Sequence, residues 1–218
     1  MKILFMGTPD FAVPSLQALL DSKHQVVGVL TQPDKPQGRK QVLTPPPVKM
    51  LASAHNIPVY QPDTLKNGAI SDLLKQTKPD LIVVVAYGKI LPRYVLDFPP
   101  KGCINVHGSL LPRWRGAAPI QWSIIAGDRD AGVTTMRMSE GLDTGNILLS
   151  KKTEIGAQET AGALFDRLAD MGASLLLDTI AELEQHDMPG IPQDESQACY
   201  ASMPVSYTHL RAHETCAD

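Results

Sequence analysis

The sequence predicts an α/β fold: a Rossmann-like, mostly parallel twisted sheet with helices on both faces. Short apolar runs alternate along the chain with segments of helical periodicity, as in right-handed βαβ units. The most continuous run, residues 80–87 (DLIVVVAY), is rich in β-branched residues, as a strand buried on both faces requires. In such sheets the ligand crevice lies beyond the carboxyl ends of the strands.

In the first half of the chain, residues 2–6 (KILFM) form an apolar run that stops at Gly7, which predicts a buried strand. Residues 11–20 have helical spacing, with Asp10 as a candidate cap and Pro14 tolerated in the first turn. The same patterns then predict strands at 26–31 and 57–60, and helices at 48–55 and 70–76.

In the second half, residues 103–107 (CINVH) form the strand that follows 80–87. A helix is expected at 118–126, and strands are expected at 133–139 and 147–155. Apolar residues from Leu164 to Leu183 recur at helical spacing and predict a long amphipathic helix that ends before Pro189. No period is sustained from about residue 190, so we expect a loosely attached tail there.

Composition and charge narrow the class of protein. The chain has 218 residues, 43% of them hydrophobic, and a net charge of -3, so no global field attracts nucleic acid. The three cysteines are far apart and lack disulfide or metal-ligand spacing, which favours a reducing compartment. The longest apolar run, residues 81–86, is far shorter than a membrane span, and the first residues lack a secretory signal. A soluble, cytoplasmic, monomeric protein without membrane contact is expected.

Asn105 and His107 are the first candidate catalytic residues. Alternate side chains of a strand share a face, so these two point the same way, about 7 Å apart, at the crevice end of their strand. Histidine shuttles protons near neutral pH, and an asparagine amide donates to a carbonyl oxygen that gains negative charge. The pair therefore suits acyl transfer to an amine. The alternative interpretation is a hydrogen-bonded turn and a capped helix.

Two nucleotide-binding patterns are not present. The segment GTPDF (7–11) follows the first strand but lacks the G-x-G-x-x-G spacing, so a nicotinamide cofactor is not expected. No P-loop lysine occurs, so ATP is not implied. No metal site is expected either, because no histidine or cysteine is adjacent to His107 in the sequence, and His209 and His213 lack partners.

Five segments resemble one known family: 5–20 (FMGTPDFAVPSLQALL), 31–49 (TQPDKPQGRKQVLTPPPVK), 83–92 (VVVAYGKILP), 104–122 (INVHGSLLPRWRGAAPIQW) and 141–148 (GLDTGNIL). The likeness extends over roughly residues 1–200 and is to the 10-formyltetrahydrofolate-dependent formyltransferases, in particular those that formylate methionyl-tRNA. It implies the transfer of a formyl group from 10-formyltetrahydrofolate, through a tetrahedral intermediate, to the amino group of initiator methionyl-tRNA.

The resemblance also implies site residues. Asn105, His107 and Asp143 match the family's catalytic asparagine, histidine and aspartate, and only the resemblance places Asp143 near His107. The SLLP loop, Ser109, Leu110, Leu111 and Pro112, matches a segment that lies against the folate. Its pocket is expected to include Tyr87, Gly88, Ile90 and Leu91 as well, although a plain strand-to-helix turn is the alternative for this stretch.

Residues 32–49 form a basic, proline-rich segment, with Lys35, Arg39, Lys40 and Lys49 opposed by Asp34 alone. We expect residues 32–47 to be a structureless loop that reaches a phosphate backbone, as the matching loop of the tRNA-formylating branch does. Arg39 and Lys40, with Lys35, are the expected RNA contacts. Arg113 and Arg115 are expected to add positive charge at the mouth of the site. A solubility role for the lysines is the alternative.

The resemblance fades near Met203. We expect a catalytic domain at 1–190, the start of a linker at 191–203 and an atypical tail at 204–218, with the family's C-terminal tRNA-binding β domain absent from a truncated chain. Two other functions stay open. The chain could formylate another amine, such as glycinamide ribonucleotide or an amino sugar, or it could be an inactive fragment that binds folate or RNA.

Overall fold

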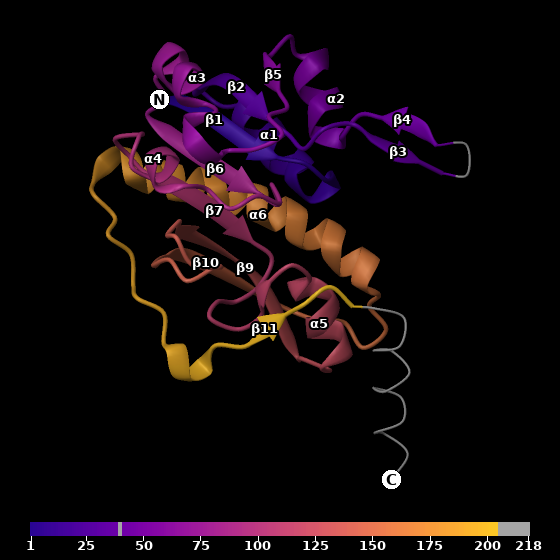
Figure 1. Ribbon diagram of the computed structural model, residues 1–218. Helices are drawn as coiled ribbons and strands as arrows, with labels where there is room; N and C mark the ends of the chain where they lie inside the picture. Colours follow the sequence, from indigo (N-terminus) through magenta and orange to yellow (C-terminus); the bar gives the residue numbers. More distant parts are fainter. Residues whose placement is uncertain (39–40, 205–218) are drawn as a thin grey trace.

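A seven-stranded sheet in the order β10-β9-β7-β6-β1-β2-β5 forms the centre of the molecule (Figure 1). The computed structural model describes residues 1–38 and 41–204. Five strands are parallel: β1 (Lys2–Gly7), β2 (Gln25–Leu30), β5 (Val59–Tyr60), β6 (Leu81–Val85) and β7 (Cys103–His107). At one edge, β9 (Asp130–Arg137) runs antiparallel to both of its neighbours, β7 and the edge strand β10 (Ile147–Glu154). The predicted α/β fold with a mostly parallel sheet is confirmed.

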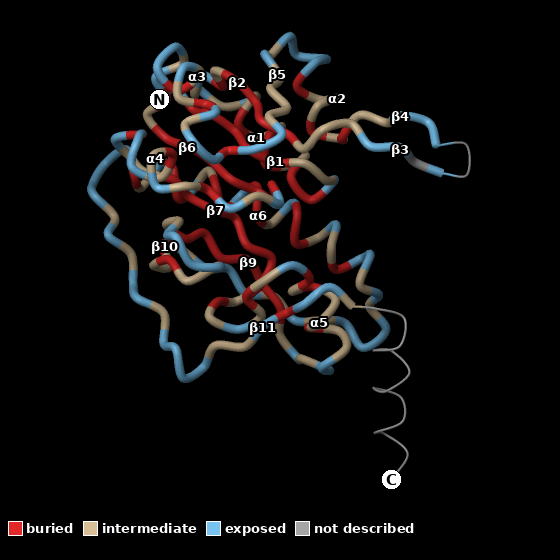
Figure 2. Tube along the Cα trace, viewed as in Figure 1, coloured by how far each residue is buried: buried red, intermediate tan, exposed pale blue. Residues whose placement is uncertain are grey.

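Helices cover both faces of this sheet, and successive residues of each strand face opposite ways. On β1, Ile3 and Phe5 join one apolar cluster while Leu4 and Met6 join the other. The first cluster packs under η1 (Asp10–Ala12), α1 (Val13–Leu20), α2 (Pro47–Ala54), α5 (Pro119–Ile125) and α6 (Ala161–Gln185). The second packs under α3 (Ser71–Thr77) and α4 (Arg93–Leu96), and it includes Leu65 and Ile70 on either side of η2 (Lys66–Gly68), which has no buried residue of its own. Figure 2 shows the buried strands between these layers.

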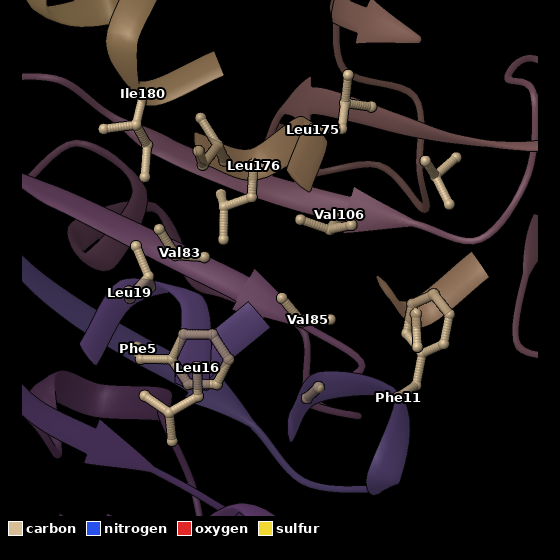
Figure 3. Close-up of a cluster of buried hydrophobic side chains, with 14 of the residues drawn as sticks. Phe5, Phe11, Leu16, Leu19, Val83, Val85, Val106, Leu175, Leu176 and Ile180 are labelled. Carbon is tan, nitrogen blue, oxygen red and sulfur yellow. The ribbon is translucent and has the colours of Figure 1, made fainter. Parts of the chain in front are cut away.

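The long helix α6 supplies much of the larger cluster. Thr160 caps its N-terminus, because the Thr160 hydroxyl accepts a hydrogen bond from the Ala163 N–H at 3.2 Å. Gly172 lets it approach β7 closely, because a Cβ at that position would lie 2.9 Å from Val106 Cγ1. Leu175, Leu176 and Ile180 of α6 belong to the same cluster as the sheet residues Val83 and Val106 (Figure 3).

Truncating Leu176 to alanine is expected to lower the free energy of unfolding by about 2–5 kcal/mol, since it removes a fully buried side chain and leaves a cavity. Denaturant unfolding of the two proteins measures this difference. The matched control is Leu43→Ala, at a side chain that is 64% exposed, where little change is expected. Equal losses in the two variants would contradict the packing described for α6.

The segment expected to be a structureless loop at 32–47 is in fact a hairpin, so that expectation is wrong. Strand β3 (Lys35–Gln37) pairs antiparallel with β4 (Val42–Thr44), and the hairpin projects from the body (Figure 1). Its base is fixed by Lys49, whose ammonium donates to both carboxylate oxygens of Asp34 at 2.8 Å. This hydrogen-bonded pair holds the pKa of Asp34 below its ordinary value.

The expectation of a loosely attached tail from residue 190 is also wrong for residues 191–202, which we call the strap. The strap runs along the body (Figure 1) and begins with paired backbone groups of Ile191 and Ile147. It includes η3 (Glu195–Gln197) and ends in β11 (Tyr200–Ala201), which pairs parallel with β8 (Arg115–Gly116). Backbone pairing and polar side chains attach it, so no hydrophobic period marks it in the sequence. None of the described helices is long and apolar enough to span a membrane.

Candidate active site

A cavity of about 580 Å³ opens at the carboxyl ends of β6 and β7, where the sequence predicted the crevice. Its wall combines the end of β6, the loop after it, the end of β7 and the loop that joins β9 to β10. Apolar side chains stand at this wall even where water reaches them: Ile90 is 80% exposed and Leu142 is 59% exposed. Such a lining suits a flat, partly apolar ligand.

Asn105 and His107 reach this cavity from one strand. Strand β7 lies between β6 and β9, and all five of its residues are buried. Because alternate residues share a face, the amide of Asn105 and the imidazole of His107 both line the cavity. The structure therefore brings together the two side chains that the strand pattern predicted.

Asp143 joins them from the loop between β9 and β10. Its Oδ1 lies 3.5 Å from Asn105 Nδ2, and its Oδ2 lies 3.8 Å from His107 Nδ1. Oδ2 also accepts a hydrogen bond from the Gly116 N–H at 2.8 Å. The backbone of Asp143 is in the left-handed region, with φ 53°. The carboxylate is thus held between the amide and the imidazole, an arrangement that spacing in the sequence does not reveal.

The hydrogen bond of the His107 ring fixes its tautomer. Nε2 lies 2.9 Å from the carbonyl oxygen of Trp114, and a carbonyl can only accept, so Nε2 carries the proton. In the neutral ring the lone pair is then on Nδ1, the atom nearest Asp143. His107 can accept a proton at Nδ1, and the Asp143 carboxylate attracts the positive charge that results.

A side chain that takes a proton, an amide that donates to an oxygen, and a carboxylate between them can catalyse acyl transfer. The formyl transferase family matches residues 1–180, which include all three side chains. This chain belongs to the formyl transferase family.

The chain is similar to methionyl-tRNA formyltransferases of several bacteria. The chain is 55% identical over 201 residues to that of Alkaliphilus oremlandii, covering 92% of this chain and 65% of the relative. It is 57% identical over 201 residues to that of Pseudomonas syringae pv. tomato, covering 92% of this chain and 64% of the relative. The chain therefore spans just under two thirds of the length of these relatives.

Solved structures of other formyltransferases share the fold. Phosphoribosylglycinamide formyltransferase from Bacillus halodurans has a TM-score of 0.70 at 23% identity, covering 84% of this chain and 95% of that one. The N-formyltransferase from Helicobacter canadensis, in complex with folinic acid and dTDP-3-aminofucose, has a TM-score of 0.71 at 21% identity, covering 93% and 71%. At these identities the likeness concerns the fold alone.

Of the folate-pocket residues expected for this formyl transferase, Tyr87, Gly88, Ile90 and Leu91 line the cavity. The Tyr87 carbonyl is already held, by Gln32 Nε2 at 3.0 Å and by the Thr8 hydroxyl at 3.3 Å. Burial raises the pKa of the Tyr87 phenol to about 12, so the phenol stays neutral. Among the described residues, this hydroxyl has no hydrogen-bond partner.

The SLLP loop, Ser109, Leu110, Leu111 and Pro112, does not line the cavity, and its folate contact stays a prediction. The structure instead shows how this loop shapes the turn after His107. The Ser109 hydroxyl donates to the Arg113 carbonyl at 2.6 Å, and the Thr134 hydroxyl donates to the Ser109 carbonyl at 2.7 Å. The turn delivers the Trp114 carbonyl to the His107 ring.

The two arginines expected at the mouth have different surroundings. Arg113 is half-exposed, pairs with Asp128 at 2.5 Å and stacks on Trp114, 4.4 Å from the ring centroid. Arg115 is 0% exposed, pairs with Glu195 and does not line the cavity, so its guanidinium is not free at the mouth as expected, and its RNA contact stays a prediction. Lys35 lies exposed on the hairpin, whereas Arg39 and Lys40 lie outside the described residues.

Sequence reasoning missed several groups at this site. The Trp114 carbonyl and the Gly116 N–H are backbone groups, and their role cannot be inferred from the residue type because almost every residue carries such groups. Gln193 donates to the Asp143 and Gly145 carbonyls from a segment without periodicity. Within residues 1–38 and 41–204, no three His, Cys, Asp or Glu side chains gather as a metal site.

Proposed function

We propose that this chain transfers the formyl group of 10-formyltetrahydrofolate to the amino group of initiator methionyl-tRNA. One observation carries the proposal: Asn105, His107 and Asp143 meet in one cavity of a formyl transferase. Identities of 55–57% to methionyl-tRNA formyltransferases over 92% of the chain support this acceptor.

The cavity suits the proposed donor. Its volume, about 580 Å³, lies in the range of small-molecule sites, and its walls are mainly apolar with a few polar groups. Tyr87, Gly88, Ile90 and Leu91 supply the wall against which a pterin ring would lie. When bound, 10-formyltetrahydrofolate supplies a formyl group attached to a nitrogen atom, and the carbon of that formyl group accepts a nucleophile.

The roles of the three side chains follow from their atoms. Asn105 Nδ2 donates a hydrogen bond to the formyl oxygen as that oxygen becomes negative, which stabilises the transition state more than the ground state. His107 takes the amine proton at Nδ1 while Nε2 remains bonded to the Trp114 carbonyl. Asp143 stabilises the charged ring, and the same proton can then pass to the departing folate nitrogen.

The hairpin at 35–44 extends this proposal to the acceptor. It projects from the body, carries the exposed Lys35 and presents Val42 and Leu43, which are 60% and 64% exposed. Its base is connected to the proposed folate pocket, because Gln32 lies just before the hairpin and donates a hydrogen bond to the carbonyl of Tyr87, which lines the cavity. A basic, projecting hairpin suits an RNA backbone near the cavity.

Replacing both Arg39 and Lys40 by alanine is expected to raise KM for methionyl-tRNA about 10-fold or more while folate affinity stays unchanged, because phosphate contacts are lost. Steady-state kinetics at two salt concentrations, with folate titration, measures both effects. The matched control is Lys151→Ala with Lys152→Ala on β10, far along the sequence from the hairpin. Equal tRNA kinetics in the wild type and the hairpin variant would remove this assignment.

The acceptor itself is tested by a panel of amines. With 10-formyltetrahydrofolate as donor, methionyl-tRNA, free methionine, glycinamide ribonucleotide and an amino sugar nucleotide are offered separately to the chain. We expect formylation of methionyl-tRNA with the highest kcat/KM. Preference for a free amine would replace the proposed acceptor and keep the formyl transfer.

A further inference from the structure

The amide of Gln193, in the strap, is fully occupied by hydrogen bonds. Its Oε1 accepts from Arg115 Nε at 3.0 Å and Nη2 at 2.8 Å. Its Nε2 donates to the carbonyls of Asp143 and Gly145, each at 2.8 Å. A guanidinium can only donate and a carbonyl can only accept, so these partners fix the orientation of the amide.

Arg115 anchors this amide. The residue is 0% exposed, and its guanidinium forms two bonds to the Glu195 carboxylate at 2.9 and 2.8 Å. A buried charge requires such partners, and a bidentate pair holds the planar group in one orientation. The pair also holds the pKa of Arg115 above its ordinary value. The amide oxygen of Gln193 is therefore held by the fixed guanidinium of Arg115, and the amide nitrogen binds the loop that carries Asp143.

The loop that Gln193 binds needs support. Asp143 has φ 53°, a left-handed conformation that is unfavourable for an L-residue and persists where the surroundings fix it. Gly145 packs so closely that a Cβ there would lie 1.6 Å from the Arg137 carbonyl oxygen. Gln193 binds the carbonyls of both residues, so it fixes the two ends of this tight turn.

The strap also reaches the backbone groups that are hydrogen-bonded to His107 and Asp143. Gly116, whose N–H donates to Asp143 Oδ2, belongs to β8, which pairs with β11 of the strap. Trp114, whose carbonyl accepts from His107, donates its own N–H to Cys199 Sγ at 3.2 Å. The strap thus touches the groups that orient His107 and Asp143 without itself lining the cavity.

We propose that the strap acts as a clasp, which holds the loop between β9 and β10 in place, and that Gln193 is the positioning residue for Asp143. Gln193 holds the Asp143 backbone in its left-handed conformation, while β11 holds the Gly116 N–H against the carboxylate. The contribution of this clasp to the rate of reaction rests on the proposed formyl transfer. Its contribution to the conformation of the loop between β9 and β10 is independent of that function.

The variant Gln193→Glu tests the clasp with minimal disturbance. A glutamate keeps an oxygen acceptor for Arg115 but cannot donate to the carbonyls of Asp143 and Gly145. The matched control is Gln197→Glu, the same change at an exposed strap residue that bonds only to Asp194. Hydrogen exchange followed by mass spectrometry reports on the peptide 139–146. Faster exchange there in Gln193→Glu alone is expected, and unchanged protection would overturn the proposal.

A kinetic cycle tests whether Gln193 acts through Asp143. In the wild-type background, Gln193→Glu is expected to lower kcat about 10- to 100-fold with little change in KM for either substrate. In an Asp143→Asn background it should cause no further loss. Equal losses in both backgrounds would overturn the positioning role. If the wild-type chain transfers no formyl group, the proposed function fails, and the exchange measurement still decides the clasp.

Discussion

His107→Ala is expected to lower kcat for formyl transfer by about 10²- to 10⁴-fold, the usual contribution of a positioned general base. The ring is buried in the cavity wall, its Nε2 is committed to the Trp114 carbonyl, and its Nδ1 faces Asp143 at 3.8 Å. Alanine leaves the amine proton without an acceptor at that place, so the chemical step slows while donor binding persists. Single-turnover formylation of methionyl-tRNA measures the loss directly.

The control for this prediction is His55→Ala, at an exposed histidine that follows α2. It removes an imidazole without touching the cavity, and wild-type kcat is expected. Circular dichroism and denaturant unfolding establish that both variants fold. A His107→Ala protein that folds and keeps wild-type kcat would exclude His107 as the proton acceptor.

Asn105→Ala is expected to lower kcat by about 10²- to 10³-fold, the loss found when one oxyanion donor is removed. Its Nδ2 is the side-chain donor that β7 places in the cavity beside His107. Because negative charge on the formyl oxygen develops only in the transition state, KM for 10-formyltetrahydrofolate should change little.

A second variant separates charge from shape. Asn105→Asp keeps the size of the side chain but replaces the NH₂ donor by a carboxylate oxygen, beside the carboxylate of Asp143. It should lose at least as much kcat as the alanine variant. If Asn105→Asp retained most of the activity, hydrogen-bond donation by Asn105 would not be the source of its effect.

The parts of the fold that follow hydrophobic periodicity were predictable. The β-branched run at 81–85 became the central strand β6, and the spacing from Leu164 to Leu183 became α6. Both owe their positions to burial of apolar side chains, and burial is what the sequence pattern records. The pair Asn105 and His107 followed from the same logic, because alternation along β7 decides the face of each side chain.

The parts held by polar groups were not predictable from pattern. The hairpin of β3 and β4 and the strap both lie outside the apolar clusters, and backbone pairing with the ion pairs of Asp34 and Arg115 fixes them. Arg115 was expected to add positive charge at the mouth of the site, yet its side chain is buried and paired with Glu195. The place of Asp143 in the site could be predicted only from the family resemblance, because Asp143 lies on a loop between two strands and no periodic pattern locates such a loop.

The most direct test of this account is transfer of an isotopically labelled formyl group from 10-formyltetrahydrofolate to methionyl-tRNA by the 218-residue chain. The His107→Ala chain serves as the control under the same conditions. The account predicts labelled N-formylmethionine after hydrolysis of the tRNA ester with the wild-type chain, and a rate at least 100-fold lower with the control. A wild-type chain that binds the folate but yields no labelled product, or equal yields from both chains, would contradict it.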